Sequence, residues 1–128
     1  MIVLLDTSSP TCRLTFVEDD WRYDDEWQAD RELAKGLLGY LYSQMQKNGR
    51  EWTDISGIGA FRGPGSFTGL RIGLTVLNTI ADTNEVPIVG VSGDAWQEQA
   101  ISRLRAGENE RMILPLYSSD AHTTKPRK

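Results

Sequence analysis

The chain has 128 residues, of which 39% are hydrophobic and 25% charged, and this length and composition predict one globular domain rather than two. The formal net charge is −4, which is the wrong sign for a protein that binds nucleic acid by itself. No apolar run approaches the ~20 residues that a membrane span needs, so we expect no membrane segment. The single cysteine, Cys12, excludes an intrachain disulfide and predicts a cytoplasmic protein.

The first part of the chain predicts three strands joined by short turns. Residues 2–5 form an apolar run that ends at Asp6 and is typical of a buried strand. Residues 12–17 and 21–27 alternate between apolar and polar side chains, which is the pattern of half-buried strands. Because only short polar stretches separate the three runs, we expect an antiparallel meander.

Helical periodicity begins after the third predicted strand. Asp30 is a suitable N-cap and Asn48-Gly49 a suitable C-terminal stop, which together predict a helix over residues 30–48. Residues 55–61 then predict a strand of small residues. A second helix is expected to follow from about Ser66 to Ala81.

The remaining elements alternate in the same way. Residues 87–91 predict a buried strand, Ser92 is expected to cap a third helix that runs to about residue 106, and residues 112–117 predict a last strand. The order βββαβαβαβ predicts an α/β fold with a mixed sheet and helices on its faces. This order occurs in ribonuclease-H-like folds and in single actin-like ATPase half-domains.

Residues 61–74, FRGPGSFTGLRIGL, contain the most informative pattern. Gly63-Pro64-Gly65 predicts a tight turn between strand and helix, and Ser66 predicts an N-cap. The helix N-terminus that results is a candidate anion or nucleotide contact, formed by Arg62, Gly63, Gly65, Ser66 and Thr68. The pattern is not a P-loop, because Leu70 follows Gly69 where that motif requires lysine.

Both of the first two helices carry more apolar residues than one buried face requires. Gly69 and Gly73 each cost about 1 kcal/mol inside a helix, so another backbone is expected to approach them closely. Either the two helices cover each other within the chain, or they offer their surface to a partner protein. The second alternative predicts a binding protein whose partner contacts are Leu33, Leu37, Tyr40, Leu41, Gly69, Leu70, Gly73, Val76, Leu77 and Ile80.

Three strings in the sequence, GPGSFTGLRIGL, LLDTSSPTCRLTF and PIVGVS, resemble the TsaB (YeaZ) family. The resemblance implies a non-catalytic subunit that binds and activates TsaD, through helices 1 and 2, for N6-threonylcarbamoyladenosine formation at position 37 of tRNAs reading ANN codons. It implies TsaE as a further partner and tRNA contact only through the complex. This chain is expected to bind no cofactor alone, because the resemblance places ATP and a metal on the partner subunits.

The resemblance extends from Ile2 to about Leu116. It implies a TsaB-like N-terminal domain over residues 1–117, a polar, basic tail over 118–128 that we expect to be mobile, and no second domain of the kind that the family carries. It leaves a homodimer of the isolated chain open. The only histidine is His122, whereas TsaD holds its metal with a pair of histidines on a helix.

An alternative function is a metal-dependent nuclease of ribonuclease-H-like fold. Asp6 ends the first strand where such enzymes place a metal-binding carboxylate, with Asp94 and Asp120 as candidate partners by position alone. The competing interpretation is that Asp6 caps the turn through backbone hydrogen bonds. Residues 18–32 hold eight acidic and two basic residues, a local charge of −6, which predicts either a solvated edge or a surface that attracts a basic protein.

Overall fold

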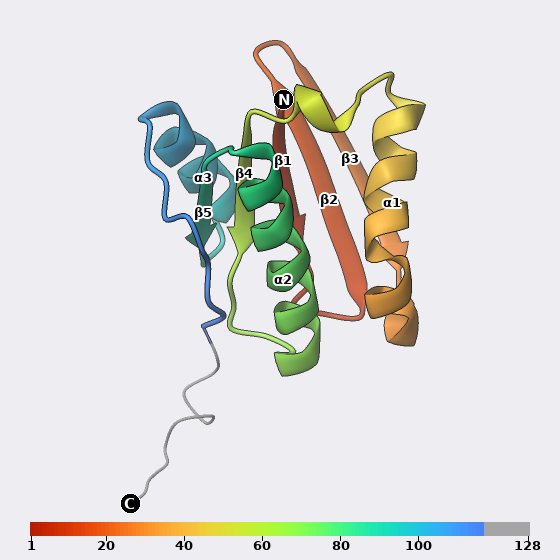
Figure 1. Ribbon diagram of the computed structural model, residues 1–128. Coiled ribbons are helices and arrows are strands. Elements are labelled where there is room, and N and C mark those ends of the chain that lie inside the picture. Colours follow the sequence, from red (N-terminus) through yellow and green to blue (C-terminus); the bar gives the residue numbers. More distant parts are fainter. Residues whose placement is uncertain (117–128) are drawn as a thin grey trace, which may run out of the picture.

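The computed structural model describes residues 1–116, which form one mixed five-stranded sheet with the strand order β3-β2-β1-β4-β5 (Figure 1). Strand β1 lies at the centre, antiparallel to β2 and parallel to β4, while β3 is antiparallel to β2 and β5 is parallel to β4. The strands are β1 (Ile2–Asp6), β2 (Thr11–Glu18), β3 (Trp21–Gln28), β4 (Gly57–Phe61) and β5 (Ile88–Val91). The predicted meander and α/β fold class are therefore confirmed.

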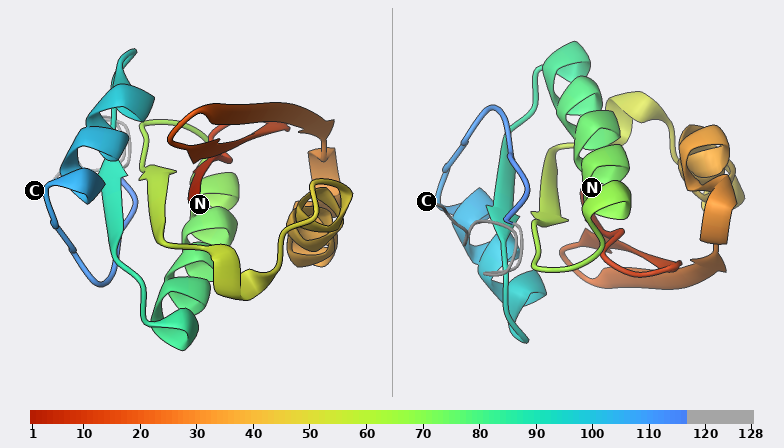
Figure 2. Two further views of the ribbon diagram at one scale, coloured as in Figure 1. Left: turned by 90° about the horizontal axis from the view of Figure 1, so that it is seen from above. Right: turned by 90° about the horizontal axis from the view of Figure 1, so that it is seen from below.

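Helices cover both faces of this sheet. Helices α1 (Leu33–Lys47) and α2 (Phe67–Asn84) lie side by side on one face, and α3 (Trp96–Arg105) lies on the other (Figures 1 and 2). Two short 3₁₀ turns, η1 (Asp30–Glu32) and η2 (Trp52–Asp54), flank α1. No helix within residues 1–116 is long and apolar enough to cross a membrane.

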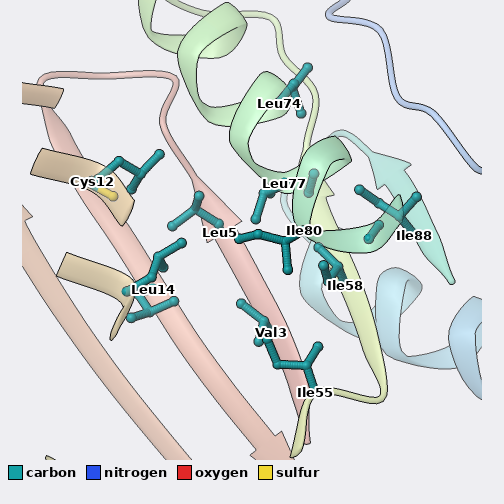
Figure 3. Close-up of a cluster of buried hydrophobic side chains, with 14 of the residues drawn as sticks. Val3, Leu5, Cys12, Leu14, Ile55, Ile58, Leu74, Leu77, Ile80 and Ile88 are labelled. Atoms are coloured by element: carbon teal, nitrogen blue, oxygen red, sulfur yellow. The ribbon is translucent and has the colours of Figure 1, made fainter. Parts of the chain in front are cut away.

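The larger core lies between the sheet and the pair α1 and α2. Strand side chains such as Val3, Leu5 and Ile58 meet Leu74 and Leu77 of α2 in this layer (Figure 3). A smaller cluster beneath α3 contains Leu4, Val17, Val89, Val91 and Ala100. Because strand side chains alternate between the two faces, the apolar run of β1 supplies both clusters.

The last predicted strand, over residues 112–117, is wrong within the described part of the chain. Residues 112–116 are extended but join no ladder of the sheet. The side-chain amide of Asn78 occupies both ladder groups of Ile113, accepting from its N–H at 2.8 Å and donating to its carbonyl at 2.9 Å. Pro115 has no N–H to offer. Tyr117 and the predicted tail, residues 118–128, lie outside the described residues.

Two of the four predicted helix boundary signals are confirmed and two are wrong. Ser66 caps α2, its Oγ accepting from Gly69 N at 3.1 Å. Helix α1 ends at Lys47, with Asn48 as its C-cap and Gly49 at a φ of 68°. Asp30 does not cap α1, because its backbone N–H donates to the Pro10 carbonyl and its φ is 49°. Ser92 does not cap α3 but donates to the carbonyl of Gly63.

Candidate partner-binding surface on two helices

The glycines of α2 face the turn that follows β1, not a second protein. Thr7, only 3% exposed, donates from Oγ1 to the Gly69 carbonyl at 2.8 Å. A Cβ on Gly69 would overlap the Thr7 carbonyl, and a Cβ on Gly73 would overlap Thr7 Oγ1 and lie 2.8 Å from its Cγ2. The predicted close approach is therefore present, but the chain supplies it itself. Gly69 and Gly73 are unavailable to a partner.

Most of the other predicted partner contacts are also buried within this chain. Leu37 on α1 and Leu77 on α2 point into the core, and so do the other members of the same stripes. The sheet is wide enough to cover one face of both helices, and the predicted stripes are those faces. The residues concerned are Leu33, Leu37, Leu41, Leu70, Leu77 and Ile80. Their assignment as contact residues must be revised.

Tyr40, another predicted contact, binds α1 to β3. Its hydroxyl donates to Asp25 Oδ2 at 2.6 Å, and its ring stacks on Trp27 with centroids 5.0 Å apart. Burial, followed by the hydrogen bond to the Asp25 carboxylate, raises the pKa of Tyr40, so the phenol stays neutral. Gln44 lies one turn along α1 from Tyr40, and its side-chain oxygen accepts a hydrogen bond from the hydroxyl of Tyr23 on β3 at 2.6 Å. These bonds fix the rotation of α1 about its axis.

With that rotation fixed, α1 presents an exposed apolar row to solvent. Ala34, Leu38 and Tyr42 follow one another at four-residue intervals, and Leu38 and Tyr42 are 54% and 43% exposed. Gly39 lies between them, and a Cβ there would meet nothing within 4 Å. We call Ala34, Leu38, Gly39 and Tyr42 the α1 outer row. Its helical spacing is visible in the sequence, but its exposure follows only from the rotation of α1.

Gly39 is the glycine of α1 that the described chain does not explain. A Cβ on Gly36 would lie 2.8 Å from Cη2 of Trp27, so packing inside the chain excludes a side chain there. Gly39 has open space and still costs helix stability of about 1 kcal/mol relative to alanine. Across from this row, Ile72 and Val76 of α2 are half-buried against the core.

The five candidate anion residues do not converge on one point. Ser66 and Thr68 line an open groove of about 700 Å³ between the N-terminal ends of α1 and α2, opposite Asp30, Arg31 and Glu32. Gly65 packs on Ser8, and the carbonyl of Gly63 accepts from Ser92.

The Arg62 side chain lies against Gly90 of β5, since a Cβ built on Gly90 would be 3.2 Å from Cδ of Arg62. Its Nε is buried without a hydrogen-bond partner in the described chain. The structure therefore separates this cation from the N-terminus of α2, and an anion at either place stays a prediction.

Asp6 caps its own turn, as the competing interpretation predicted. Its Oδ1 accepts from the backbone N–H of Ser8 at 2.8 Å. Within residues 1–116, no three side chains of His, Cys, Asp or Glu come together as metal ligands. Asp94 is exposed and Asp120 lies outside the described residues. The nuclease alternative therefore has no site in the described part of the chain.

Several acids of the segment 18–32 have partners inside the chain. Glu18 pairs with Arg50 at 2.7 Å, and the hydrogen bond from this guanidinium lowers the pKa of Glu18. Asp24 accepts from Arg22 and from Thr15, and both bonds lower its pKa, with that of Arg22 the larger cause. The charge of the segment is thus partly neutralised at the end of β2 and within β3.

Comparison with known proteins places these features in a family. The family model described as "TsaD: tRNA N6-adenosine threonylcarbamoyltransferase" matches residues 27–118. The chain is 30% identical over 117 residues to the tRNA threonylcarbamoyladenosine biosynthesis protein TsaB of Escherichia coli (strain K12), covering 87% of this chain and 51% of that protein. The protein of the same name from Haemophilus influenzae is 26% identical over 108 residues, which cover 84% of this chain and 46% of the relative.

A solved structure shows the same fold. YeaZ from Pseudomonas aeruginosa superposes with a TM-score of 0.69 at 27% identity, covering 82% of this chain and 49% of that chain. This likeness supports the description of the sheet and its helices as an actin-like half-domain. The chain spans about half the length of the curated relatives it matches.

Proposed function

The chain belongs to the TsaB/YeaZ family, and from this premise we propose that it acts in N6-threonylcarbamoyladenosine formation on tRNA as a non-catalytic subunit. In this proposal the chain binds and activates a TsaD partner, and the partner transfers the threonylcarbamoyl group. In the proposal this chain contacts tRNA only as part of the complex with TsaD, and TsaE is a further subunit of that complex. The proposal extends to residues 1–117 as the domain that makes the TsaD contact.

The observation that carries the proposal is the α1 outer row. Leu38 and Tyr42 expose apolar surface on a helix whose opposite face is fully used by the core. Gly39 between them leaves room for another backbone to approach. A helix that exposes Leu38 and Tyr42, with open space at Gly39 close by, is suited to receive a helix of another protein. Ile72 of α2 lines the same groove as Ala34 of this row.

The proposal assigns the transfer chemistry to the TsaD partner, and two reactive side chains of this chain, Asp6 and Cys12, are engaged within it. Within residues 1–116, the carboxylate of Asp6 is occupied by its turn, and no group of metal ligands is assembled. Cys12 is 1% exposed, and burial raises its pKa to about 12, so its thiol is not a nucleophile at neutral pH. ATP and the metal are assigned by the proposal to partner subunits.

Co-purification with the cognate TsaD tests the proposal with a matched pair of leucines. Leu38→Glu and Leu114→Glu make the same chemical change at exposed sites on different faces. We expect Leu38→Glu to weaken TsaD binding at least about tenfold, as burying a carboxylate in an apolar contact costs more than about 1.4 kcal/mol. Leu114→Glu should leave TsaD binding unchanged. Isothermal titration calorimetry measures both, and thermal melts verify that both variants fold.

If Leu38→Glu bound TsaD with wild-type affinity, the result would show that the α1 outer row does not contact TsaD. A wild-type chain that shows no TsaD binding, in a buffer where it is folded, would overturn the proposed function itself. Modification of tRNA by the reconstituted proteins then reports whether binding also activates the partner.

A further inference from the structure

A second exposed apolar feature lies on the flank of α2 that is away from α1 (Figure 1). Met112, Leu114 and Leu116 are 64%, 64% and 46% exposed, while Ile113 between the first two is buried. We call Met112, Leu114 and Leu116 the C-terminal strip. Large apolar side chains that alternate along an extended segment, all facing solvent, are a feature of binding surfaces rather than of the core.

The C-terminal strip is held rigidly from behind. The two hydrogen bonds between Asn78 and the Ile113 backbone fix its middle, and Leu116 N donates to the Arg62 carbonyl at 2.6 Å. The Ile113 side chain fills the space above Gly90, where a Cβ would lie 2.6 Å from its Cγ2. A partner would therefore not have to order this segment on binding, which removes one cost of association.

Met112 and Leu114 of the C-terminal strip form one wall of an open groove of about 440 Å³. The opposite wall is the row Arg71, Thr75 and Thr79, which follow one another at four-residue intervals on α2 and are exposed. The floor is made by Leu74, Asn78, Ile113 and Pro115. One wall is thus polar and the other apolar. The groove therefore suits an occupant with polar side chains on one face and apolar side chains on the other.

The charge of the groove is opposite to that of the chain. Arg71 lines it, and no carboxylate does, although the chain carries a net charge of −4. The Arg71 guanidinium lies 5.2 Å from the Phe67 ring centroid and forms no ion pair with a residue of the described chain. Phe67 begins α2, so the positive end of the helix dipole adds to the same side of the groove.

We propose that this groove docks an amphipathic segment of a partner protein, with apolar side chains against the C-terminal strip and a carboxylate at Arg71. A second copy of this chain is the less suitable occupant, because a symmetric contact of groove with groove would bring in two Arg71 side chains and no carboxylate from the groove lining to pair with them. The proposal does not depend on the proposed function, because the α1 outer row contributes nothing to the groove.

Two synthetic amphipathic peptides test the proposal on the full chain. They share one row of leucines, and the polar positions carry glutamate in one and lysine in the other. The titration is followed by ¹H–¹⁵N correlation spectra at low salt. We expect the glutamate peptide to bind about fivefold more tightly, which is the scale of an exposed ion pair, and to shift residues 71–79 and 112–116. Non-specific attraction to a chain of charge −4 would favour the lysine peptide instead.

Variants then separate the two walls. Arg71→Gln should abolish the preference between the peptides, Leu114→Ser should weaken both, and Leu38→Ser on α1 should change neither. A preference for the lysine peptide, shifts centred on α1, or an unchanged preference in Arg71→Gln would each overturn the proposal. Measuring TsaD binding by the same variants tests the proposed function separately. Leu114→Ser should bind TsaD as the wild type does, although it binds both peptides more weakly.

Discussion

Alanine in place of a glycine should have opposite effects at two positions of the helix pair. A methyl group added to Gly39 on α1 would meet nothing within 4 Å, so Gly39→Ala should gain helix propensity without a clash. The gain is about 0.8–1 kcal/mol in the free energy of unfolding. For a chain of this length that corresponds to an increase of about 4 °C in melting temperature.

Gly73→Ala should instead destabilise the chain. The new methyl would overlap Thr7 Oγ1 and lie 2.8 and 2.9 Å from Thr7 Cγ2 and Cβ. Thr7 cannot give way without breaking its bond to the Gly69 carbonyl, because it is buried on all sides. Over-packing of about 1–3 kcal/mol and the lost bond of about 1 kcal/mol exceed the gain in propensity, which leaves a loss of about 2 kcal/mol.

Urea denaturation followed by circular dichroism measures both variants, and a double-mutant cycle identifies the cause. In a Thr7→Gly background the atoms that meet the methyl are gone, so Gly73→Ala should lose most of its cost, a coupling above about 1 kcal/mol. If Gly73→Ala proved as stable as the wild type, or if its cost persisted without Thr7, the packing account of α2 would be refuted. Gly39→Ala should also weaken TsaD binding about tenfold by blocking close approach.

Three further outcomes concern chemistry and local bonds. Cys12 should not react with Ellman's reagent at mildly alkaline pH until the chain unfolds, because burial raises its pKa to about 12; fast reaction in native buffer would contradict this. The hydrogen bond from the Arg50 guanidinium lowers the pKa of Glu18 below its ordinary 4.5. Their pairing therefore adds stability that is fully present above pH 4.5 and is lost as the pH falls through the lowered pKa. Arg50→Met should make the free energy of unfolding fall less steeply with decreasing pH in this range, as measured by urea denaturation at several pH values. Asn78→Ala should cost about 2 kcal/mol in urea denaturation through its two bonds to Ile113, and an unchanged midpoint would show that they contribute nothing.

The fold follows closely from local patterns in the sequence. The alternation in residues 12–17 and 21–27 and the short apolar runs at 2–5 and 87–91 each correspond to a strand, because burial on one or both faces determines such patterns. Ser66 was identifiable as a cap because its partner, Gly69, is three residues away. Signals whose partner is also nearby in the chain are readable without a structure.

The errors share the opposite property, since each depends on a partner far along the chain. Asp30 resembles a cap, but the Pro10 carbonyl takes its N–H and turns the backbone. The strand expected at 112–117 is prevented by Asn78, thirty-five positions away from Ile113. Most of the predicted partner contacts are buried for the same reason, because a wide apolar stripe does not reveal which part faces the sheet.

The glycines of α2 show how a correct inference can receive the wrong partner. Their cost predicted a close approach by another backbone. Thr7, 62 residues before Gly69, meets Gly69 with its backbone carbonyl but meets Gly73 with its side chain. No local feature of Thr7 indicates this role. The sequence does not distinguish Gly39 from the other glycines. The open space around Gly39 becomes visible only when the rest of the fold is known, because it depends on where all the other residues lie.

The central place of β1 has a consequence for synthesis on the ribosome. This strand is translated before the other four strands, and β2 and β3 can fold onto one of its edges as soon as they follow. Its other edge stays open until Gly57–Phe61 has been translated. During that interval the nascent chain displays unpaired backbone beside Val3, Leu4 and Leu5, which is a template for pairing with other nascent chains. A polypeptide that ends before residue 57 should therefore aggregate rather than fold.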